Sequence, residues 1–308
     1  MADFQGIIVI HKEKGFTSHD VVAKLRGICR QKKIGHTGTL DPQATGVLPV
    51  CLGNATRACE MLTDRTKEYV AELLTDKEKT YEAVLHLGID TDTQDMSGTV
   101  LEERPVNVTE EEVRKVLKSF VGEQLQVPPM YSALKVNGKK LYELAREGKT
   151  VERKARPVCF YEIEPLEFHL PLVKIRVTCS KGTYIRTLCH DIGEKLGCGG
   201  CMEELLRSRV GRYSLFESHT LAQVEAAVAD GTVQDMIDPV EAVLAEYPAL
   251  YADSYGDRLL ANGNPLSDNL VRPQHKEGWV RMYASDGTFT GIFQWDAGKK
   301  KYYPVKMF

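Results

Sequence analysis

The chain has 308 residues, of which 43% are hydrophobic and 27% are charged, the composition of an ordinary globular protein. This length exceeds what one hydrophobic core usually holds, so we expect one large domain and a smaller module. No run of about 18 apolar residues could span a membrane, and the N-terminus lacks the features of a signal peptide, so we expect a cytoplasmic protein. The eight cysteines are too sparse for a disulfide scaffold and are predicted to be free thiols.

The charges are unevenly distributed along the chain. The net charge of −3, from 40 Lys and Arg against 43 Asp and Glu, excludes a nucleic-acid binder that is basic over its whole surface. Basic residues nevertheless gather at 23–33 and 135–156, and acidic residues at 90–112 and 217–246. Each block alone is most simply a solvent-exposed face, but together they indicate a polarised surface that could hold a polyanion.

The first predicted element is a buried strand at residues 7–10, followed by a helix that Ser18 could cap. Residues 35–50 are expected to form an irregular loop, because they contain three glycines and two prolines. Beyond it we expect strands at 81–88, 158–163 and 173–179 and helices at 109–120, 184–196 and 220–230. A capping box begins the first of these helices at Thr109, and Gly197 ends the second. Strands and helices interleave without the regular alternation of a dinucleotide-binding fold, which favours an α+β fold with a mixed sheet.

The composition changes near Pro248, and the residues beyond it are typical of β-structure. The turn signals SDG and DAG separate three strand-like segments, at 279–284, 288–295 and 302–308. We therefore predict a large domain at residues 1–247 and a small β-rich C-terminal domain at 248–308.

A short tandem repeat at residues 62–85 runs into the predicted strand at 81–88. Residues 62–73 and 74–85 share the skeleton L-T-D-x-x-K-x-Y-x-A-x-L. One tandem copy is too little for a solenoid, so a local duplication or a two-stranded hairpin is the simplest account. The repeat places Tyr69 and Tyr81 at equivalent positions.

Asp41 is the single acid of residues 35–50 and is the candidate catalytic group of this segment. Pro42 favours an extended backbone at Asp41, which would hold the carboxylate outward on a stiff loop. A structural Asx turn is the alternative for an aspartate before proline. The residue pattern alone leaves both possibilities open.

GHTGTLDP at residues 35–42 and ATGVLP at 44–49 closely resemble the signature of the bacterial tRNA pseudouridine-55 synthases. Four further segments resemble other motifs of that family: KTY at 79–81, VPPMYSALKVNG at 127–138, KGTYIRTL at 181–188 and LLRSRVG at 205–211. The resemblance covers about residues 5–245, and the C-terminal module is similar to the family's PUA-like RNA-binding domain. One departure is HKEKG at 11–15, which lacks the proline that the family usually carries before its glycine.

The resemblance implies the pseudouridine-synthase fold, with a mixed, largely antiparallel sheet, and isomerisation of one uridine in the T-loop of tRNA. In this reaction the base is flipped out of the stack, detached from C1′ of the ribose and rejoined through C5. The exchange needs a carboxylate at the ribose, and Asp41 matches the family's catalytic aspartate. Whether Asp41 acts as a nucleophile or as a base at C2′ is left open.

Four supporting residues are carried over from the resemblance. Arg186 matches the arginine that pairs with the catalytic aspartate, since a guanidinium can keep a carboxylate charged in a closed pocket. His36 matches the histidine that takes the place of the flipped base, although a lone loop histidine is more often an ordinary polar residue. Tyr184 and Leu205 match a pocket aromatic and a pocket-wall aliphatic residue, for which plain core packing is the alternative.

The tyrosine that stacks on the flipped base is ambiguous because of the repeat. Tyr81 is in register when counted backward from Leu87, whereas Tyr69 is nearer the family distance when counted forward from Gly53. We predict Tyr81, because its strand runs on into residues 90–93 as in the family. Otherwise, both tyrosines would simply pack on a half-buried strand.

The partner implied by the resemblance is tRNA, held at its T-arm by shape and by phosphate contacts. Besides basic segments at 24–33, 135–156 and 299–301, we expect RNA contacts from five lysines: Lys12, Lys32, Lys33, Lys135 and Lys181. We expect no cofactor, because the bond exchange involves neither oxidation nor hydrolysis. We also expect a monomer that requires neither a membrane nor a protein partner.

Two segments superficially suggest a metal site. Cys198 and Cys201 form a CxxC pair near Cys189 and His190, but no second pair follows, and we expect a loop that joins two helices there. Residues 90–98 resemble a calcium loop but lack its central glycine and its terminal bidentate glutamate. We therefore expect no metal.

Two rival functions remain compatible with the sequence. The first is a catalytically silent RNA-binding or RNA-folding protein on the same scaffold. The second is a guide-RNA-directed synthase for ribosomal RNA, which would require additional protein partners and a longer basic tail.

Overall fold

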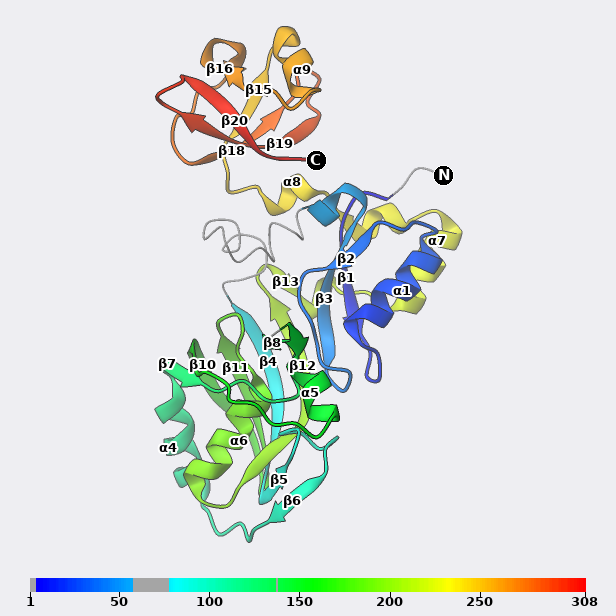
Figure 1. Ribbon diagram of the computed structural model, residues 1–308. Helices are drawn as coiled ribbons and strands as arrows, with labels where there is room; N and C mark the ends of the chain where they lie inside the picture. Colours follow the sequence, from blue (N-terminus) through cyan, green and yellow to red (C-terminus); the bar gives the residue numbers. More distant parts are fainter. Residues whose placement is uncertain (1–3, 58–77, 137) are drawn as a thin grey trace.

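The computed structural model describes residues 4–57, 78–136 and 138–308 of the chain. Its two main sheets lie at opposite ends of an elongated molecule, the larger sheet running through the lower two thirds of Figure 1 and the smaller sheet lying above it. The larger sheet carries the helices α1, α4, α6 and α7. This is the α+β architecture that the sequence predicts.

The larger sheet has ten strands in the order β14-β1-β3-β12-β4-β11-β10-β7, with β2 paired to β3 and β13 paired to β12. Their bounds are β1 Gly6–Lys12, β2 Ile34–His36, β3 Thr45–Leu52, β4 Lys79–Leu87, β7 Gly122–Gln126, β10 Arg156–His169, β11 Leu172–Cys179, β12 Gly200–Val210, β13 Tyr213–Ser214 and β14 Ile237–Asp238. Among the described strand pairs of this sheet, β12 and β3 are parallel and the others are antiparallel. The predicted mixed, largely antiparallel sheet is confirmed.

Two pairs of helices cover this sheet. Helices α1 (Ser18–Ile28) and α7 (Leu221–Asp230) pack on β1 and β3, while α4 (Glu110–Phe120) and α6 (Ile185–Leu196) pack on β10, β11 and β4. Strand β1 is buried on both faces, since Ile8 and Ile10 join the core under α1 and α7 while Ile7 and Val9 join a second core. This explains why its sequence is continuously apolar rather than alternating.

The helix termini largely follow the predicted signals. Thr109 forms the expected capping box with Glu112, and Gly197 ends α6 with a positive φ of 79°. The predicted cap Ser18 is wrong, because Thr17 caps α1 through a box with Asp20. Ser18 is instead buried, and its hydroxyl accepts a hydrogen bond from the backbone N–H of Leu40 at 2.9 Å. It thus ties α1 to the loop of the candidate site.

Two predicted loops are partly strands. Residues 45–50 of the expected 35–50 loop belong to β3. This strand tolerates Pro49 because, on one edge, β12 pairs at 45–46 and β2 at 50–52, so Pro49 lies between these two neighbours. Cys201 lies in β12, and residues 198–201 connect a helix to a strand rather than to another helix.

The smaller sheet begins at Ala249, next to the predicted boundary at Pro248. Its six strands run in the order β16-β20-β19-β18-β15-β17, with α9 (Ser254–Leu260) packed beside them. Their bounds are β15 Ala249–Ala252, β16 Leu266–Ser267, β17 Val271–Arg272, β18 Trp279–Tyr283, β19 Phe289–Asp296 and β20 Lys301–Met307. Ile292 of β19 belongs to the same buried apolar cluster as Ile7 and Val9 of β1, and Val240, Val243 and Leu244 at α8 (Val240–Val243) also contribute to this cluster.

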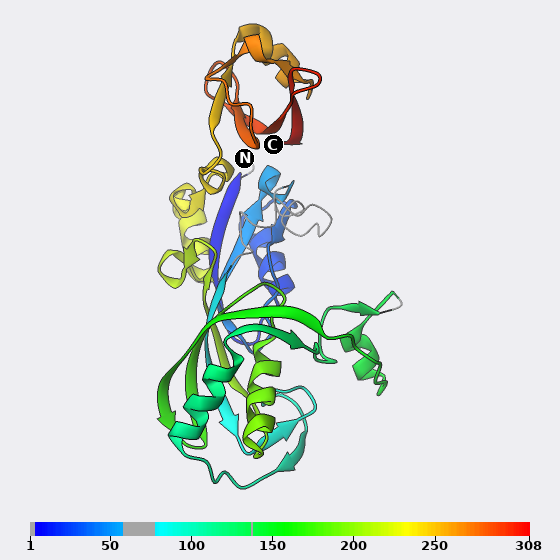
Figure 2. The ribbon, with the colours of Figure 1, turned by 90° about the vertical axis from the view of Figure 1, so that its left-hand side faces the viewer.

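Short elements complete the fold. A small hairpin, β8 and β9, with the following helix α5 projects to the right of the large sheet in Figure 2. The bounds of the short elements are η1 Gly53–Ala55, β5 Ile89–Thr91, β6 Val100–Glu103, β8 Lys135–Val136, β9 Lys139–Lys140, α5 Leu141–Arg146, η2 Leu215–Glu217, η3 Val233–Met236, α8 Val240–Val243 and η4 Asp268–Leu270.

The cysteines and the membrane prediction can be compared with the structure directly. Six cysteines are free thiols: Cys29, Cys159, Cys179, Cys189, Cys198 and Cys201. Cys51 is disulfide-bonded, which corrects the expectation that all cysteines are free. Within the part of the chain that the structure describes, no helix combines the length and apolarity needed to cross a bilayer.

We predict that Gly46→Ala strongly destabilises the fold. Gly46 has a φ of +106°, and a Cβ there would lie 2.2 Å from the backbone oxygen of Arg207 on the parallel neighbour β12. Backbone strain and overpacking together should lower the free energy of unfolding by about 2–4 kcal/mol, measurable by urea denaturation. Gly231→Ala is the control, because Gly231 also has positive φ but open space around it. Equal losses in the two variants would contradict the close approach of β3 and β12.

Candidate active site

Asp41 lies on the loop between β2 and β3, and backbone contacts fix this loop from several sides. The carbonyl oxygen of Pro42 accepts a hydrogen bond from the N–H of Gly15 at 2.8 Å, and that of Asp41 accepts one from Ala44 at 3.1 Å. The loop is therefore rigid, while the side chain of Asp41 remains 39% exposed. A fixed backbone with an accessible carboxylate is the arrangement that a group acting on a bound substrate requires.

Arg186, near the start of α6, forms an ion pair with Asp41. Its Nε lies 2.9 Å from Oδ2 of Asp41, and its Nη2 lies 3.3 Å from Oδ1. The guanidinium is only 4% exposed, and it also donates to the carbonyl oxygens of Thr93 at 3.1 Å and Tyr131 at 2.8 Å. The carboxylate of Asp95 lies 3.7 Å from Nε. These contacts preorganise the arginine, so it holds the carboxylate of Asp41 in one orientation.

Tyr184 lies immediately before α6 and is held by Gln126, the last residue of β7. The side-chain amide of Gln126 donates to the carbonyl oxygen of Tyr184 at 3.0 Å and accepts from its N–H at 2.8 Å. Gln126 is 4% exposed, so this paired contact is shielded from water. Burial raises the pKa of the Tyr184 phenol, which is neutral at physiological pH.

Tyr81 and Leu205 lie on the adjacent strands β4 and β12 and belong to one apolar cluster with Leu40 and Ala44, which flank Asp41. Tyr81 is 7% exposed and Leu205 is 9% exposed. Burial raises the pKa of Tyr81 to about 12, although the nearby guanidinium of Arg207 opposes this shift. The two side chains form an apolar floor beside the carboxylate.

His36 is half-buried at the end of β2, at the start of the Asp41 loop. Burial lowers the pKa of its imidazole, and the charge of His19 acts in the same direction. The ring is therefore mainly neutral at physiological pH. A neutral, planar ring suits stacking between bases better than a charged one.

Lys12 does not fit the predicted role of RNA contact. Its side chain is 0% exposed, and its ammonium donates to the carbonyl oxygens of Phe16 at 2.7 Å, Glu13 at 3.1 Å and Pro42 at 3.2 Å. Burial lowers its pKa to about 8, partly opposed by the charge of Asp41. Because no part of it faces solvent, Lys12 acts inside the protein, where it holds the loop of Asp41.

The other four predicted RNA contacts, Lys32, Lys33, Lys135 and Lys181, are exposed. Lys33 donates to the side chain of Asn54 at 3.0 Å. Lys135 is on the hairpin that projects from the sheet in Figure 2, four residues after Tyr131, whose carbonyl oxygen accepts a hydrogen bond from Arg186. The segment that contacts Arg186 thus continues into the projecting hairpin, which carries lysines.

Three residues of the site were not assigned a role from sequence. Asp95 and Gln126 position Arg186 and Tyr184, and Arg207 donates to the carbonyl oxygens of Val47 at 2.8 Å and Thr39 at 3.3 Å. Arg207 stands inside the motif LLRSRVG, which is the signal that could have identified it. Asp95 and Gln126 lie in segments where no local pattern distinguishes them from ordinary polar residues.

Hydrogen bonds within residues 90–98 hold the side chain of Asp95. The carboxylate of Asp95 accepts from the hydroxyl of Thr93 at 2.8 Å and from the N–H of Ser97 at 3.0 Å. Within residues 4–57, 78–136 and 138–308, no group of three or more His, Cys, Asp or Glu side chains is arranged to hold a metal ion.

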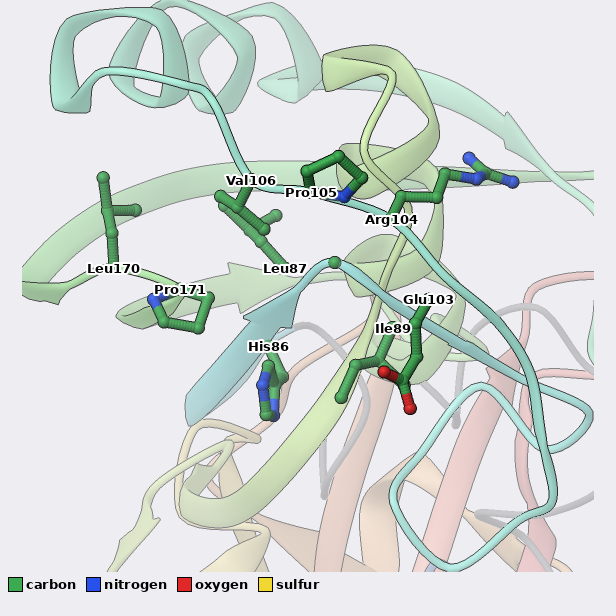
Figure 3. Close-up of a pocket in the computed structure, with 10 residues that line it drawn as sticks. His86, Leu87, Ile89, Glu103, Arg104, Pro105, Val106, Leu170 and Pro171 are labelled. Carbon is green, nitrogen blue, oxygen red and sulfur yellow. The ribbon is translucent and has the colours of Figure 1, made fainter.

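A pocket of about 540 Å³ lies away from Asp41, between residues 86–89, 103–106 and 170–171 (Figure 3). Arg104 borders it and pairs with Asp90 at 3.1 Å and with Glu194 of α6 at 2.8 Å. This network anchors one end of the segment that brings Thr93 and Asp95 to Arg186. The pocket contains none of the predicted site residues.

The fold is that of the pseudouridylate synthases. The family described as TruB family pseudouridylate synthase, N-terminal domain, matches residues 26–75 and 70–185, and the tRNA pseudouridylate synthase B C-terminal domain matches residues 186–245. The chain therefore belongs to the TruB family of pseudouridylate synthases, a family of isomerases. The family predicted from its motifs is confirmed.

Curated relatives match nearly the whole chain. The tRNA pseudouridine synthase B of Lachnoclostridium phytofermentans is 50% identical, over 98% of this chain and 99% of the relative. That of Clostridium kluyveri is 41% identical, over 98% of each. Among solved structures, a chain in the crystal structure of a Cbf5-Nop10-Gar1 complex superposes with a TM-score of 0.70 and 27% identity, over 98% of this chain and 84% of that chain.

We predict that Lys12→Met destabilises the protein and does so in a pH-dependent manner. Removing the ammonium leaves carbonyl oxygens without their donor, which should cost about 1–3 kcal/mol at pH 7. Burial lowers the pKa of Lys12 from 10.5 to about 8, so between these values the unfolded chain binds more protons than the folded one. The stability that wild type has over the variant should therefore increase from pH 8 to pH 10 in urea denaturation. A difference that shrinks over this range would contradict the buried position of Lys12.

Proposed function

We propose that this enzyme is a tRNA pseudouridine-55 synthase that isomerises one uridine in the T-loop of tRNA. The observation that carries the proposal is the ion pair of Asp41 and Arg186, two residues 145 positions apart that the fold brings to 2.9 Å. Each lies in a motif of the family, and the curated relatives are tRNA pseudouridine synthases B. An accessible carboxylate oriented by a buried guanidinium is suited to act at a ribose.

The proposed reaction begins when the uridine is flipped out of the T-loop and enters the site. Asp41 then acts at the ribose, either as nucleophile at C1′ or as base at C2′, and the C1′–N1 bond breaks with its electron pair on N1. The detached base turns and C5 forms a bond to C1′, which displaces Asp41 from C1′ in the first path and is accompanied by return of the C2′ proton in the second. The proton of C5 is then lost while N1 gains one. Atoms and electrons balance without a cofactor, so none is required.

The apolar floor would hold the base during this exchange. Tyr81 offers an aromatic face for stacking, which contributes about 1–3 kcal/mol per base. Tyr184 and Leu205 would close the pocket around the base, and neutral His36 would fill the space vacated in the T-loop stack. Tyr81 and Tyr184 interact electrostatically with Asp41, and Leu205 belongs to the apolar cluster that includes Leu40, next to Asp41 in the sequence.

The RNA would be bound chiefly through its phosphates and its shape. Lys32, Lys33, Lys135 and Lys181 would contact the T-arm, and Lys299, Lys300 and Lys301 would extend the contact surface to the C-terminal domain at 248–308. We further propose that the enzyme acts as a cytoplasmic monomer without a protein partner.

We predict that Asp41→Asn binds an unmodified tRNA transcript but does not convert it. The amide keeps the shape of the carboxylate and removes its charge and basicity, so the single-turnover rate should fall by at least about 10²–10⁴-fold. Release of tritium from C5-labelled uridine measures the rate, and filter binding measures affinity. Asp230→Asn, an exposed residue at the end of α7, is the matched control. Equal activity of wild type and Asp41→Asn would refute the catalytic role of Asp41, whereas binding without conversion by wild type would favour the silent RNA-binding function.

We predict that Tyr81→Leu lowers the single-turnover rate by about 5–150-fold, the equivalent of one lost stacking contact. Tyr69→Leu should leave the rate nearly unchanged, although Tyr69 lies outside the described residues. The same tritium-release assay at saturating RNA compares the two variants. A loss confined to Tyr69→Leu would transfer the stacking role to Tyr69.

A further inference from the structure

Arg207 is a buried cation on β12, beside the Asp41 loop. Its side chain is 1% exposed, and among the described residues it takes part in no ion pair within 4 Å. Nε and Nη1 donate to backbone carbonyl oxygens, while Nη2 is buried without a hydrogen-bond partner of acceptable geometry. Burying a charge without a counter-ion is costly, and an apolar residue of similar length would avoid this cost.

The two hydrogen bonds of Arg207 span the loop that carries Asp41. Thr39 precedes Asp41 by two residues, and Val47 lies within β3 after the loop; their carbonyl oxygens accept from the same guanidinium at 3.3 Å and 2.8 Å. The backbone of Arg207 also lies directly against Gly46, where a Cβ would come within 2.2 Å of its carbonyl oxygen. Arg207 therefore holds both ends of the Asp41 loop through its side-chain hydrogen bonds.

Tyr81 is the direct neighbour of Arg207 on the other side. The two residues are opposite one another in the antiparallel pairing of β4 and β12, so their side chains lie on the same face of the sheet. Both are buried, at 7% and 1% exposure. Burial raises the pKa of Tyr81, and the guanidinium opposes this shift, which places the charge beside the phenol. Asp41 interacts electrostatically with both.

We propose that Arg207 is a positioning residue that joins the hydroxyl of Tyr81 to both ends of the Asp41 loop. Nη2, the donor that has no hydrogen-bond partner among the described residues, would donate to the phenol oxygen, so that the stacking face and the carboxylate keep one relative position while the base is exchanged. Its charge also favours the negative charge that collects on the base when the C1′–N1 bond breaks. This inference rests on the proposed roles of Asp41 and Tyr81.

Arg207→Met and Arg207→Lys test the proposal in the full-length enzyme with an unmodified tRNA transcript. The single-turnover rate at saturating RNA should fall about 10²-fold for methionine, as for the loss of one preorganised donor. Arg207→Lys keeps the charge, so its single-turnover rate should be about tenfold higher than that of Arg207→Met. The Kd for RNA should change less than about threefold in both variants. Arg176→Met is the control, because Arg176 on β11, the other neighbour of β4, pairs with Glu82 and Glu164 at the surface and is 42% exposed. Its rate should equal that of wild type.

A double-mutant cycle with Tyr81→Phe separates positioning from a purely structural role. If Arg207 acts through the phenol oxygen, Arg207→Lys should cost at least about threefold less in the Tyr81→Phe background than in wild type. Additive losses would overturn the proposal. Thermal unfolding of each variant identifies any that does not fold. If Arg207→Met does not fold, the cycle of Arg207→Lys with Tyr81→Phe still tests the positioning role.

Failure of this inference can be told apart from failure of the proposed function. An inactive wild type would refute the function itself, and an Asp41→Asn variant as active as wild type would refute the role of Asp41. If wild type converts tRNA and Asp41→Asn does not, but Arg207→Met matches Arg176→Met, the function stands and only the role of Arg207 is refuted.

Discussion

The ion pair between Asp41 and Arg186 is the interaction on which the site depends. Its partners are 145 residues apart, and they meet because the loop between β2 and β3 faces the start of α6. Neither partner is free to reorient. Arg186 is held by the carbonyl oxygens of Thr93 and Tyr131, and the Asp41 loop is held by its own backbone contacts. The geometry is thus set before a substrate arrives, which avoids reorganisation during the reaction.

A surplus of positive charge surrounds this carboxylate, although the whole chain carries a net charge of −3. Lys12 and Arg207 are buried close to Asp41, and both are bound by backbone carbonyl oxygens rather than by carboxylates. Carbonyl oxygens satisfy the donors without cancelling their charge. The site therefore keeps a positive potential for a polyanionic substrate and for a base that becomes negative, and the protein as a whole need not be basic.

The sequence predicts what local patterns determine and misses what distant segments determine. The capping box at Thr109, the end of α6 at Gly197 and the strands of the C-terminal sheet follow from nearby residues and are confirmed. Lys12 is predicted to contact RNA, but its side chain is buried. Only the folded chain brings the carbonyl oxygen of Pro42, thirty residues away, to its ammonium. The role of Ser18 likewise depends on Leu40, twenty-two residues on.

The parallel contact of β3 and β12 explains why the site forms where it does. Antiparallel pairing dominates the large sheet, and the two residue pairs 45–206 and 46–207 interrupt it. Because Gly46 lacks a side chain, the backbone of Arg207 approaches closely enough for its guanidinium to reach back under the loop to Thr39. The same strand presents Leu205 to the floor and pairs with Tyr81 on β4. One close backbone approach thereby aligns the Asp41 loop, the buried guanidinium of Arg207 and the ring of Tyr81. None of the sequence motifs could position these three groups alone.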